Sequence, residues 1–172
     1  LPYSNAEGYE ETAQYDSLKI KISQMLIFGI QDAQKVLEED SLLEAYANMH
    51  LGGIILFEKN LAKKRSKNQL KALVDEIQRI SKIPSFVAID EEGGNVTRLK
   101  SQYGFHETKT AKYLGNRNNL DSTYYYAKLT SDLLKELGIN VNLAPTVDLE
   151  INDENFISRA ERSYGRDSDR VF

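Results

Sequence analysis

The residues best suited to chemistry stand directly after a short apolar run. The segment "AIDEEGGNVTRL" places three carboxylates, Asp90, Glu91 and Glu92, within eight positions of Arg98. Ionised carboxylates and a guanidinium form directional, charge-assisted hydrogen bonds to polar ligands. The same groups could equally form an ion-pair network at the rim of the fold, because buried charges need partners. The spacing alone leaves both interpretations open.

Other polar side chains give weaker signals. Asn142 and Asp148 lie in and after a later apolar run, where a solvated turn is a better interpretation than a binding site. His50 and His106 are isolated in the sequence and fit surface or capping roles. The sequence has no cysteine and no spacing typical of a zinc or EF-hand site, so it predicts neither a metal nor a cofactor.

Apolar segments of two kinds must position these groups. The predicted strands cover residues 25–30, 54–57, 85–89 and 139–149, and the predicted helices cover 32–50, 66–80 and 121–137. Ser66 is expected to cap the second helix. Asp121 or Ser122 is expected to open the third helix, and Gly138 to end it.

The alternation of strands and helices indicates the fold class. Strands that are apolar on both faces are typical of an α/β fold, with either a parallel sheet covered by helices or a (β/α)8 barrel. The glycines match neither a dinucleotide-binding fingerprint nor a phosphate-binding loop. In both kinds of α/β fold the functional groups sit at the carboxyl ends of strands. The Asp90 cluster is predicted to lie there.

Composition limits the classes of function. The 172 residues include 22 basic and 26 acidic side chains, a formal net charge of -4, so neither nucleic acid nor an anionic membrane is an expected partner. No apolar run is long enough to span a bilayer. We expect one domain over residues 17–172 after a poorly ordered lead-in over 1–16. The start at Leu1 rather than Met leans towards a secreted or envelope location and leaves the compartment open.

Several segments together resemble one enzyme family. They are, in chain order, "GGIILFEKN", "AIDEEGGNVTRL", "LGINVNLAPTVDL" and "RSYGRDSDRV". Their order and spacing resemble the N-terminal domain of glycoside hydrolase family 3, closest to its bacterial β-N-acetylhexosaminidases, over about residues 17–172. The resemblance implies a TIM-like (β/α)8 barrel. This chain looks like the N-terminal half of that barrel, with about four parallel strands and alternating helices.

The resemblance also implies an activity and the residues that bind its substrate. These family members remove a terminal β-linked N-acetylglucosamine with retention, from glycans such as peptidoglycan fragments. The matching motifs imply that Asp90 and Arg98 bind the terminal sugar. Arg162 is the third expected binding residue, chosen over Arg159 because "RSYG" begins at Arg162.

Neighbouring residues are expected to support this sugar site. The resemblance implies that Glu92 orients Arg98 or amides of the rim, and that Gly93 and Gly94 let the backbone pass close to the sugar. Asn95 stands where the family usually has a basic residue.

The same resemblance places the catalytic groups elsewhere. The family's acid/base His follows a Lys-His-Phe-x-Gly-His-Gly motif after the fifth strand, and its nucleophilic Asp lies two strands later. Neither motif occurs in this sequence. No catalytic residue is therefore assigned in this chain; both groups are expected in further chain, and we do not expect hydrolysis by these 172 residues alone.

Other functions also fit the sequence. One is a non-catalytic half-barrel that binds sugar or assembles with a second chain, since a four-stranded piece of a barrel exposes sheet edges that favour self-association. Another is β-glucosidase or β-xylosidase activity, because the family includes both.

Overall fold

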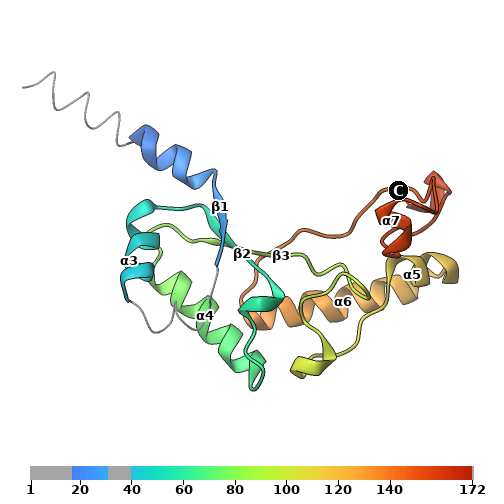
Figure 1. Cartoon of the computed structure of the whole chain (residues 1–172), viewed down its shortest axis with the longest axis horizontal. Coiled ribbons are helices and arrows are strands. Elements are labelled where there is room, and N and C mark those ends of the chain that lie inside the picture. Colours follow the sequence, from blue (N-terminus) through green and yellow to red (C-terminus); the bar gives the residue numbers. More distant parts are fainter. Residues whose placement is uncertain (1–16, 31–39, 172) are drawn as a thin grey trace, which may run out of the picture.

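A parallel sheet forms the centre of the molecule (Figure 1). The computed structural model describes residues 17–30 and 40–171, and the predicted lead-in at 1–16 lies outside these residues, as do residues 32–39 of the first predicted helix. The strands are β1 (Ile27–Gly29), β2 (Gly53–Leu56), β3 (Phe86–Ile89) and β4 (Val141–Asn142). They lie in the order β1-β2-β3-β4, and every neighbouring pair is parallel. The predicted α/β class is confirmed.

Helices connect the strands and cover the sheet. They are a helical segment at 17–24, α3 (Asp40–Met49), α4 (Ser66–Ile80), α5 (Ala111–Arg117), α6 (Leu120–Leu137), α7 (Phe156–Arg159) and α8 (Ser168–Val171), with 3-10 turns η1 (Glu58–Asn60) and η2 (Ser101–Tyr103). α4 and α6 pack against each other along the same side of the strands (Figure 1). The sequence analysis missed α5, a short helix that opens on the side chain of Thr110.

The core lies between the two central strands and this helix pair. The apolar face predicted for the second helix is confirmed in α4, where Leu70, Leu73 and Ile77 are almost fully buried. Leu137 of α6 and Val87 of β3 belong to the same buried cluster. Each such side chain stabilises the fold by roughly 1.5–3 kcal/mol relative to an exposed position.

Two predicted N-terminal caps are wrong, and one predicted helix end is confirmed. Arg65, in the left-handed region, precedes α4, and Ser66 is its first residue; the Ser66 hydroxyl donates to the carbonyl of Ala62 instead of capping. Asn119 caps α6 by accepting a hydrogen bond from Ser122 N at 2.8 Å. Gly138 ends α6 in the left-handed region, with φ 78°.

The outer strands differ from the predicted buried strands. Ile27 and Phe28 of β1, which forms an edge of the sheet in the described part of the chain, are 45% and 46% exposed. β4 is much shorter than the predicted 139–149 segment, since β3 has already ended at Ile89. Beyond the ladder, the side chain of Asn140 continues the bonding: its Oδ1 accepts from Val87 N at 2.8 Å and its Nδ2 donates to Ser85 O at 3.0 Å.

None of the helices in the described part of the chain is long and apolar enough to cross a membrane.

Candidate functional site

Asp90 and Arg98 form an ion pair just past the carboxyl end of β3. Arg98 Nη2 donates to Asp90 Oδ2 across 2.9 Å. About a quarter of each side chain is exposed, 26% for Asp90 and 24% for Arg98. Arg98 Nε is buried and has no hydrogen-bond partner among the described residues. The contact is therefore single rather than forked, and both charged groups keep surface that a ligand can reach.

A tight turn brings Arg98 back to Asp90. Glu92 N and Gly93 N both donate to the carbonyl of Val96, at 3.0 and 3.1 Å, and Val96 N donates to the carbonyl of Gly93 at 3.2 Å. The chain therefore reverses within a few residues of β3, which places Arg98 beside the residue that ends the strand.

The two glycines of this turn serve the packing of the protein itself. Gly93 and Gly94 have φ of 94° and 55°, in the left-handed region that L side chains rarely adopt. A Cβ on Gly93 would lie 2.6 Å from the carbonyl oxygen of Lys109, and one on Gly94 would lie 2.7 Å from Thr110 N. The expectation that these glycines make room for a sugar is wrong, because residues 108–110 fill that space.

Glu91 points away from Asp90 and is buried, with 4% of its surface exposed. Its carboxylate accepts hydrogen bonds from the hydroxyl of Thr97, from Arg98 N at 2.8 Å and from Leu99 N at 3.1 Å. The sequence analysis gave Glu91 no role of its own. Side chains alternate along extended chain, and this alternation could have placed Glu91 opposite Asp90 and Glu92.

Glu92 pairs with Arg162 and not, as expected, with Arg98. Arg162 Nη2 lies 2.6 Å from Glu92 Oε1 and Arg162 Nε lies 2.9 Å from Glu92 Oε2, so the contact is forked. Arg162 Nη2 also donates to Thr146 Oγ1 at 3.0 Å, and the guanidinium lies 5.5 Å from the ring centre of Phe156. The hydrogen bond with Glu92 raises the pKa of Arg162. Glu92 is only 8% exposed, compared with 22% for Arg162.

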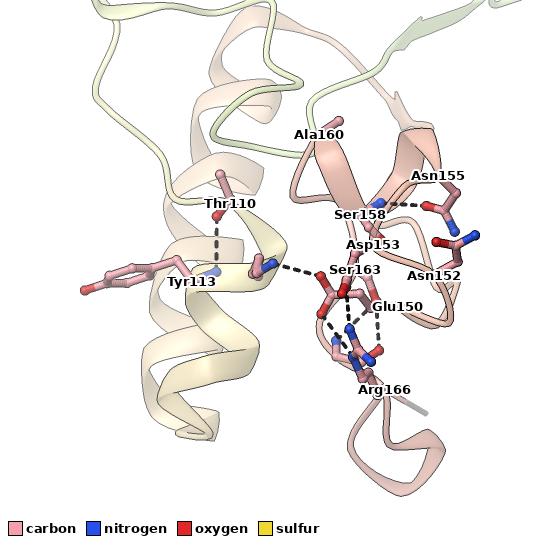
Figure 2. A network of polar contacts seen from close by, with 12 residues as sticks. Thr110, Tyr113, Glu150, Asn152, Asp153, Asn155, Ser158, Ala160, Ser163 and Arg166 are labelled. Carbon is pink, nitrogen blue, oxygen red and sulfur yellow. Dashed lines mark hydrogen bonds and ion pairs between the residues drawn. The ribbon is translucent and has the colours of Figure 1, made fainter.

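An ionic network attaches the loop that carries Arg162 to α5 (Figure 2). Lys112 of α5 donates to Glu150 Oε1 at 2.8 Å, and Arg166 Nε lies 3.9 Å from Glu150 Oε2. Arg166 also pairs with Asp153. Glu150 thus joins the helix to both ends of the loop, and the loop holds Arg162 against the end of β3.

Close backbone contact reinforces this attachment. A Cβ on Gly115 of α5 would lie 1.7 Å from the carbonyl oxygen of Tyr164. The hydroxyl of Ser163 donates to the carbonyl of Asp148 at 2.7 Å. Arg159, the alternative weighed against Arg162, is exposed in the last turn of α7. The structure therefore brings Arg162, and not Arg159, to the site.

The remaining polar candidates lie apart from these pairs or support them. Asp148 is exposed, and Asn142 bonds to the main chain of Glu91. The carbonyl of His50 accepts from Gln24 Nε2 at 2.7 Å, and His106 Nε2 is buried without a partner among the described residues. Over residues 17–30 and 40–171, no group of His, Cys, Asp and Glu side chains could hold a metal ion.

Among the hollows that adjoin the residues after β3, two include a member of these ion pairs. One, of about 410 Å³, is lined by Phe57, Glu58, Lys59 and Arg98. The other, of about 320 Å³, lies between α6 and the residues after β3, and its lining includes Glu92. Ligands of α/β folds bind beyond the carboxyl ends of the strands. The hollow beside Arg98 lies there and includes a member of the more accessible ion pair.

Comparison with known proteins identifies the family. A family model described as "Glycosyl hydrolase family 3 N terminal domain" matches residues 17–172. The chain belongs to glycoside hydrolase family 3. Among curated family members, it is 34% identical to β-hexosaminidase A of Pseudoalteromonas piscicida over 128 residues, which is 66% of this chain and 20% of that protein. It is 28% identical to β-hexosaminidase LpqI of Mycobacterium tuberculosis over 86% of this chain and 35% of that protein.

Solved structures of the family have the same architecture. A glycoside hydrolase family 3 β-N-acetylglucosaminidase from Paenibacillus sp. matches with a TM-score of 0.75 and 33% identity, over 90% of this chain and 28% of that one. A family member from Mycobacterium smegmatis matches with a TM-score of 0.70 and 27% identity, over 90% of this chain and 43% of that one. The four parallel strands and their helices thus correspond to part of larger family 3 barrel domains. The chain spans less than half the length of the relatives it matches.

Proposed function

We propose that this chain supplies the sugar-binding residues of a glycoside hydrolase that releases terminal β-linked N-acetylglucosamine. The observation that carries the proposal is the partly exposed Asp90–Arg98 pair at the carboxyl end of β3, in a family 3 domain. Asp90 would accept hydrogen bonds from sugar hydroxyls, and Arg98 would donate to sugar oxygens. Relatives named β-hexosaminidase and β-N-acetylglucosaminidase support the choice of sugar.

Binding, rather than proton transfer, is the role that these carboxylates suit. Asp90 and Glu92 each accept hydrogen bonds from a guanidinium, as carboxylates that hold or orient polar groups do. A general acid must carry a proton when the glycosidic bond breaks, and a retaining enzyme needs both such an acid and a nucleophile. The proposal therefore assigns the acid/base and the nucleophile to residues outside this chain.

Calorimetric titration with N-acetylglucosamine tests the binding role. Asp90→Ala should weaken binding about ten- to a hundredfold, because one charge-assisted bond contributes roughly 1.5–3 kcal/mol. Asp132→Ala, on the exposed face of α6, is the matched control and should bind as the unsubstituted protein does. Unchanged affinity in the Asp90 variant would remove Asp90 from the site.

A substrate panel tests the identity of the sugar. The full-length protein should release p-nitrophenol from its N-acetyl-β-glucosaminide faster than from the β-glucoside or β-xyloside. A preference for either of the other two substrates would instead favour β-glucosidase or β-xylosidase activity, which the same binding residues can serve.

A binding or assembly module is the second candidate, because β1 exposes apolar side chains at an edge of the sheet. Ile27 and Phe28 are each nearly half exposed, and exposed edge strands pair readily with other chains. Light scattering on the protein would show a concentration-dependent oligomer that Phe28→Lys abolishes. A monomer at every concentration would exclude assembly through this edge.

A further inference from the structure

Glu91 forms a compact polar unit beneath the Asp90–Arg98 pair. Glu91 is 4% exposed, and the donors to its carboxylate are all neutral: the hydroxyl of Thr97 and the main-chain amides of Arg98 and Leu99. Burying a carboxylate is unfavourable unless hydrogen bonds compensate for the lost water. The buried carboxylate therefore needs all of these hydrogen bonds. Because of them, the position of the Glu91 side chain fixes the main chain at residues 97–99.

Both ends of this unit are anchored. Asn142 of β4 accepts from Glu91 N at 3.0 Å and donates to Glu91 O at 3.1 Å, so the main chain of Glu91 is attached to the sheet. Leu99, at the other end, is 2% exposed and belongs to the core. Arg98 lies between these anchors, and its side chain turns outwards to Asp90.

We propose that Glu91 is a positioning residue, which fixes Arg98 for ligand binding by holding its main-chain amide. This inference rests on the proposed sugar-binding role of Arg98. The side-chain contact between Arg98 and Asp90 is a single hydrogen bond, which leaves the guanidinium able to swing about it. Fixing the main chain of Arg98 narrows the range of positions that the guanidinium can take. A pre-positioned donor binds a ligand more tightly than one that must be ordered on binding.

Two substitutions separate positioning from charge. Glu91→Gln can keep every contact, since its amide oxygen can accept from the amides of Arg98 and Leu99 while its NH2 group donates to the hydroxyl of Thr97. Glu91→Ala removes all of them. Positioning predicts that the Gln variant behaves like the unsubstituted protein and that the Ala variant does not.

The first experiment measures the side-chain order of the arginines without any ligand. In protein carrying ¹⁵N-labelled arginine, the heteronuclear NOE of Arg98 Nε should fall in Glu91→Ala and be preserved in Glu91→Gln. Arg162 Nε, held by Glu92, is the internal control and should not change. An ordered Arg98 in Glu91→Ala, or equal loosening of both arginines, would overturn the proposal.

The second experiment is a double-mutant cycle with N-acetylglucosamine as the ligand. Glu91→Ala should weaken binding about tenfold, as displacement of a binding group does, and Glu91→Gln should restore most of that loss. In an Arg98→Ala background, Glu91→Ala should have no further effect, because Glu91 acts through Arg98. Additive losses would show that Glu91 acts by another route and would contradict the proposal.

The two experiments distinguish the possible failures. If the unsubstituted protein does not bind N-acetylglucosamine, the proposed function fails, while the NOE comparison still decides whether Glu91 positions Arg98. If Glu91→Ala does not fold, Thr97→Val replaces it, because it removes one donor and preserves side-chain shape. A partial fall in the Arg98 NOE supports the proposal in that case, and an unchanged NOE contradicts it.

Discussion

The Asp90–Arg98 and Glu92–Arg162 pairs begin two residues apart after β3, yet their surroundings differ. Arg98 makes one hydrogen bond to a carboxylate that is 26% exposed. Arg162 makes a forked contact to a carboxylate that is 8% exposed and also contacts Thr146. Donors already occupied within the protein contribute less to a ligand. The first pair is therefore suited to binding, and the second to holding the loop that carries Arg162.

The difference also refines the role expected for Arg162. The resemblance to the family led us to expect that both arginines bind sugar, and the structure brings both to the end of β3. Arg162 is 22% exposed, so it can touch a ligand while it holds its loop. We therefore expect its substitution to reduce stability as well as affinity, whereas changes at Asp90 and Arg98 should act mainly on affinity.

The largest expected effect is on stability and separates the two carboxylates. Glu92→Ala removes a forked contact made by a carboxylate that is only 8% exposed and should lower the free energy of unfolding by about 3 kcal/mol. Asp90→Ala breaks a more exposed pair and should cost about 1 kcal/mol. Urea denaturation of both variants measures the two values. Equal losses of unfolding free energy in the two variants would show that the two ion pairs contribute equally to stability.

A substitution in α5 tests how firmly the loop of Arg162 is attached. Gly115→Ala places a Cβ 1.7 Å from the carbonyl oxygen of Tyr164, so the loop must move. We expect a loss of about 2 kcal/mol in the free energy of unfolding, as for other overpacked sites. Ala for Gly within a helix normally stabilises by up to ~1 kcal/mol. A stabilised variant would therefore contradict the close contact.

The stability of the protein at alkaline pH should depend on the ionic network beside Arg162. The hydrogen bond to Glu150 raises the pKa of Lys112 above its ordinary value of 10.5. The resulting stability is fully present below that value and is lost as the pH rises through the higher pKa of the folded state. Lys112→Met should remove this loss, which we expect to be at most ~1 kcal/mol for so exposed a pair. Unfolding measured between pH 9 and 12 should show a flatter profile; an unchanged profile would exclude Lys112 as the titrating group.

The stability of the protein at acid pH should depend on an ion pair near Arg98, and this is the smallest effect that we expect. The hydrogen bond from Lys100 lowers the pKa of Glu58 below its ordinary value of 4.5. This stability is present above the ordinary value and disappears as the pH falls through the lower folded-state pKa. Glu58→Gln should flatten the profile below the ordinary value by a few tenths of a kcal/mol. If the Gln variant keeps the full acid dependence, other carboxylates must account for it.

Local features of the site were predictable from the sequence, and long-range features were not. Asp90 and Arg98 are eight residues apart and joined by a glycine turn, so their motif already placed them together. Glu92 and Arg162 are 70 residues apart, and their contact depends on how the later loop folds onto α5. Sequence spacing carries no information about that packing, which is why Glu92 was assigned to Arg98 or to amides of the rim and not to Arg162.

The difference between local and long-range features also explains which predictions about the fold were wrong. The periodicity of α4 predicted its buried face, because the helix repeat is a local property. The exposure of Phe28 depends on which strands and helices flank β1, and its apolar character does not reveal that. Asn119, Asp121 and Ser122 can all cap a helix, so only the structure shows that Asn119 does so.

Asn140, just before β4, and Asn142, in β4, fix the register of this strand against β3. Asn140 and Asn142 each offer one acceptor and one donor to the main chain of β3 and its flanking residues, on either side of a ladder with only two residue pairs. A ladder this short has little resistance to sliding. A slip by one residue would turn the main-chain donors and acceptors of β3 away from both amides, because these groups alternate in direction along a strand. The alignment of the proposed binding residues thus depends on side chains that imitate the backbone of a longer strand.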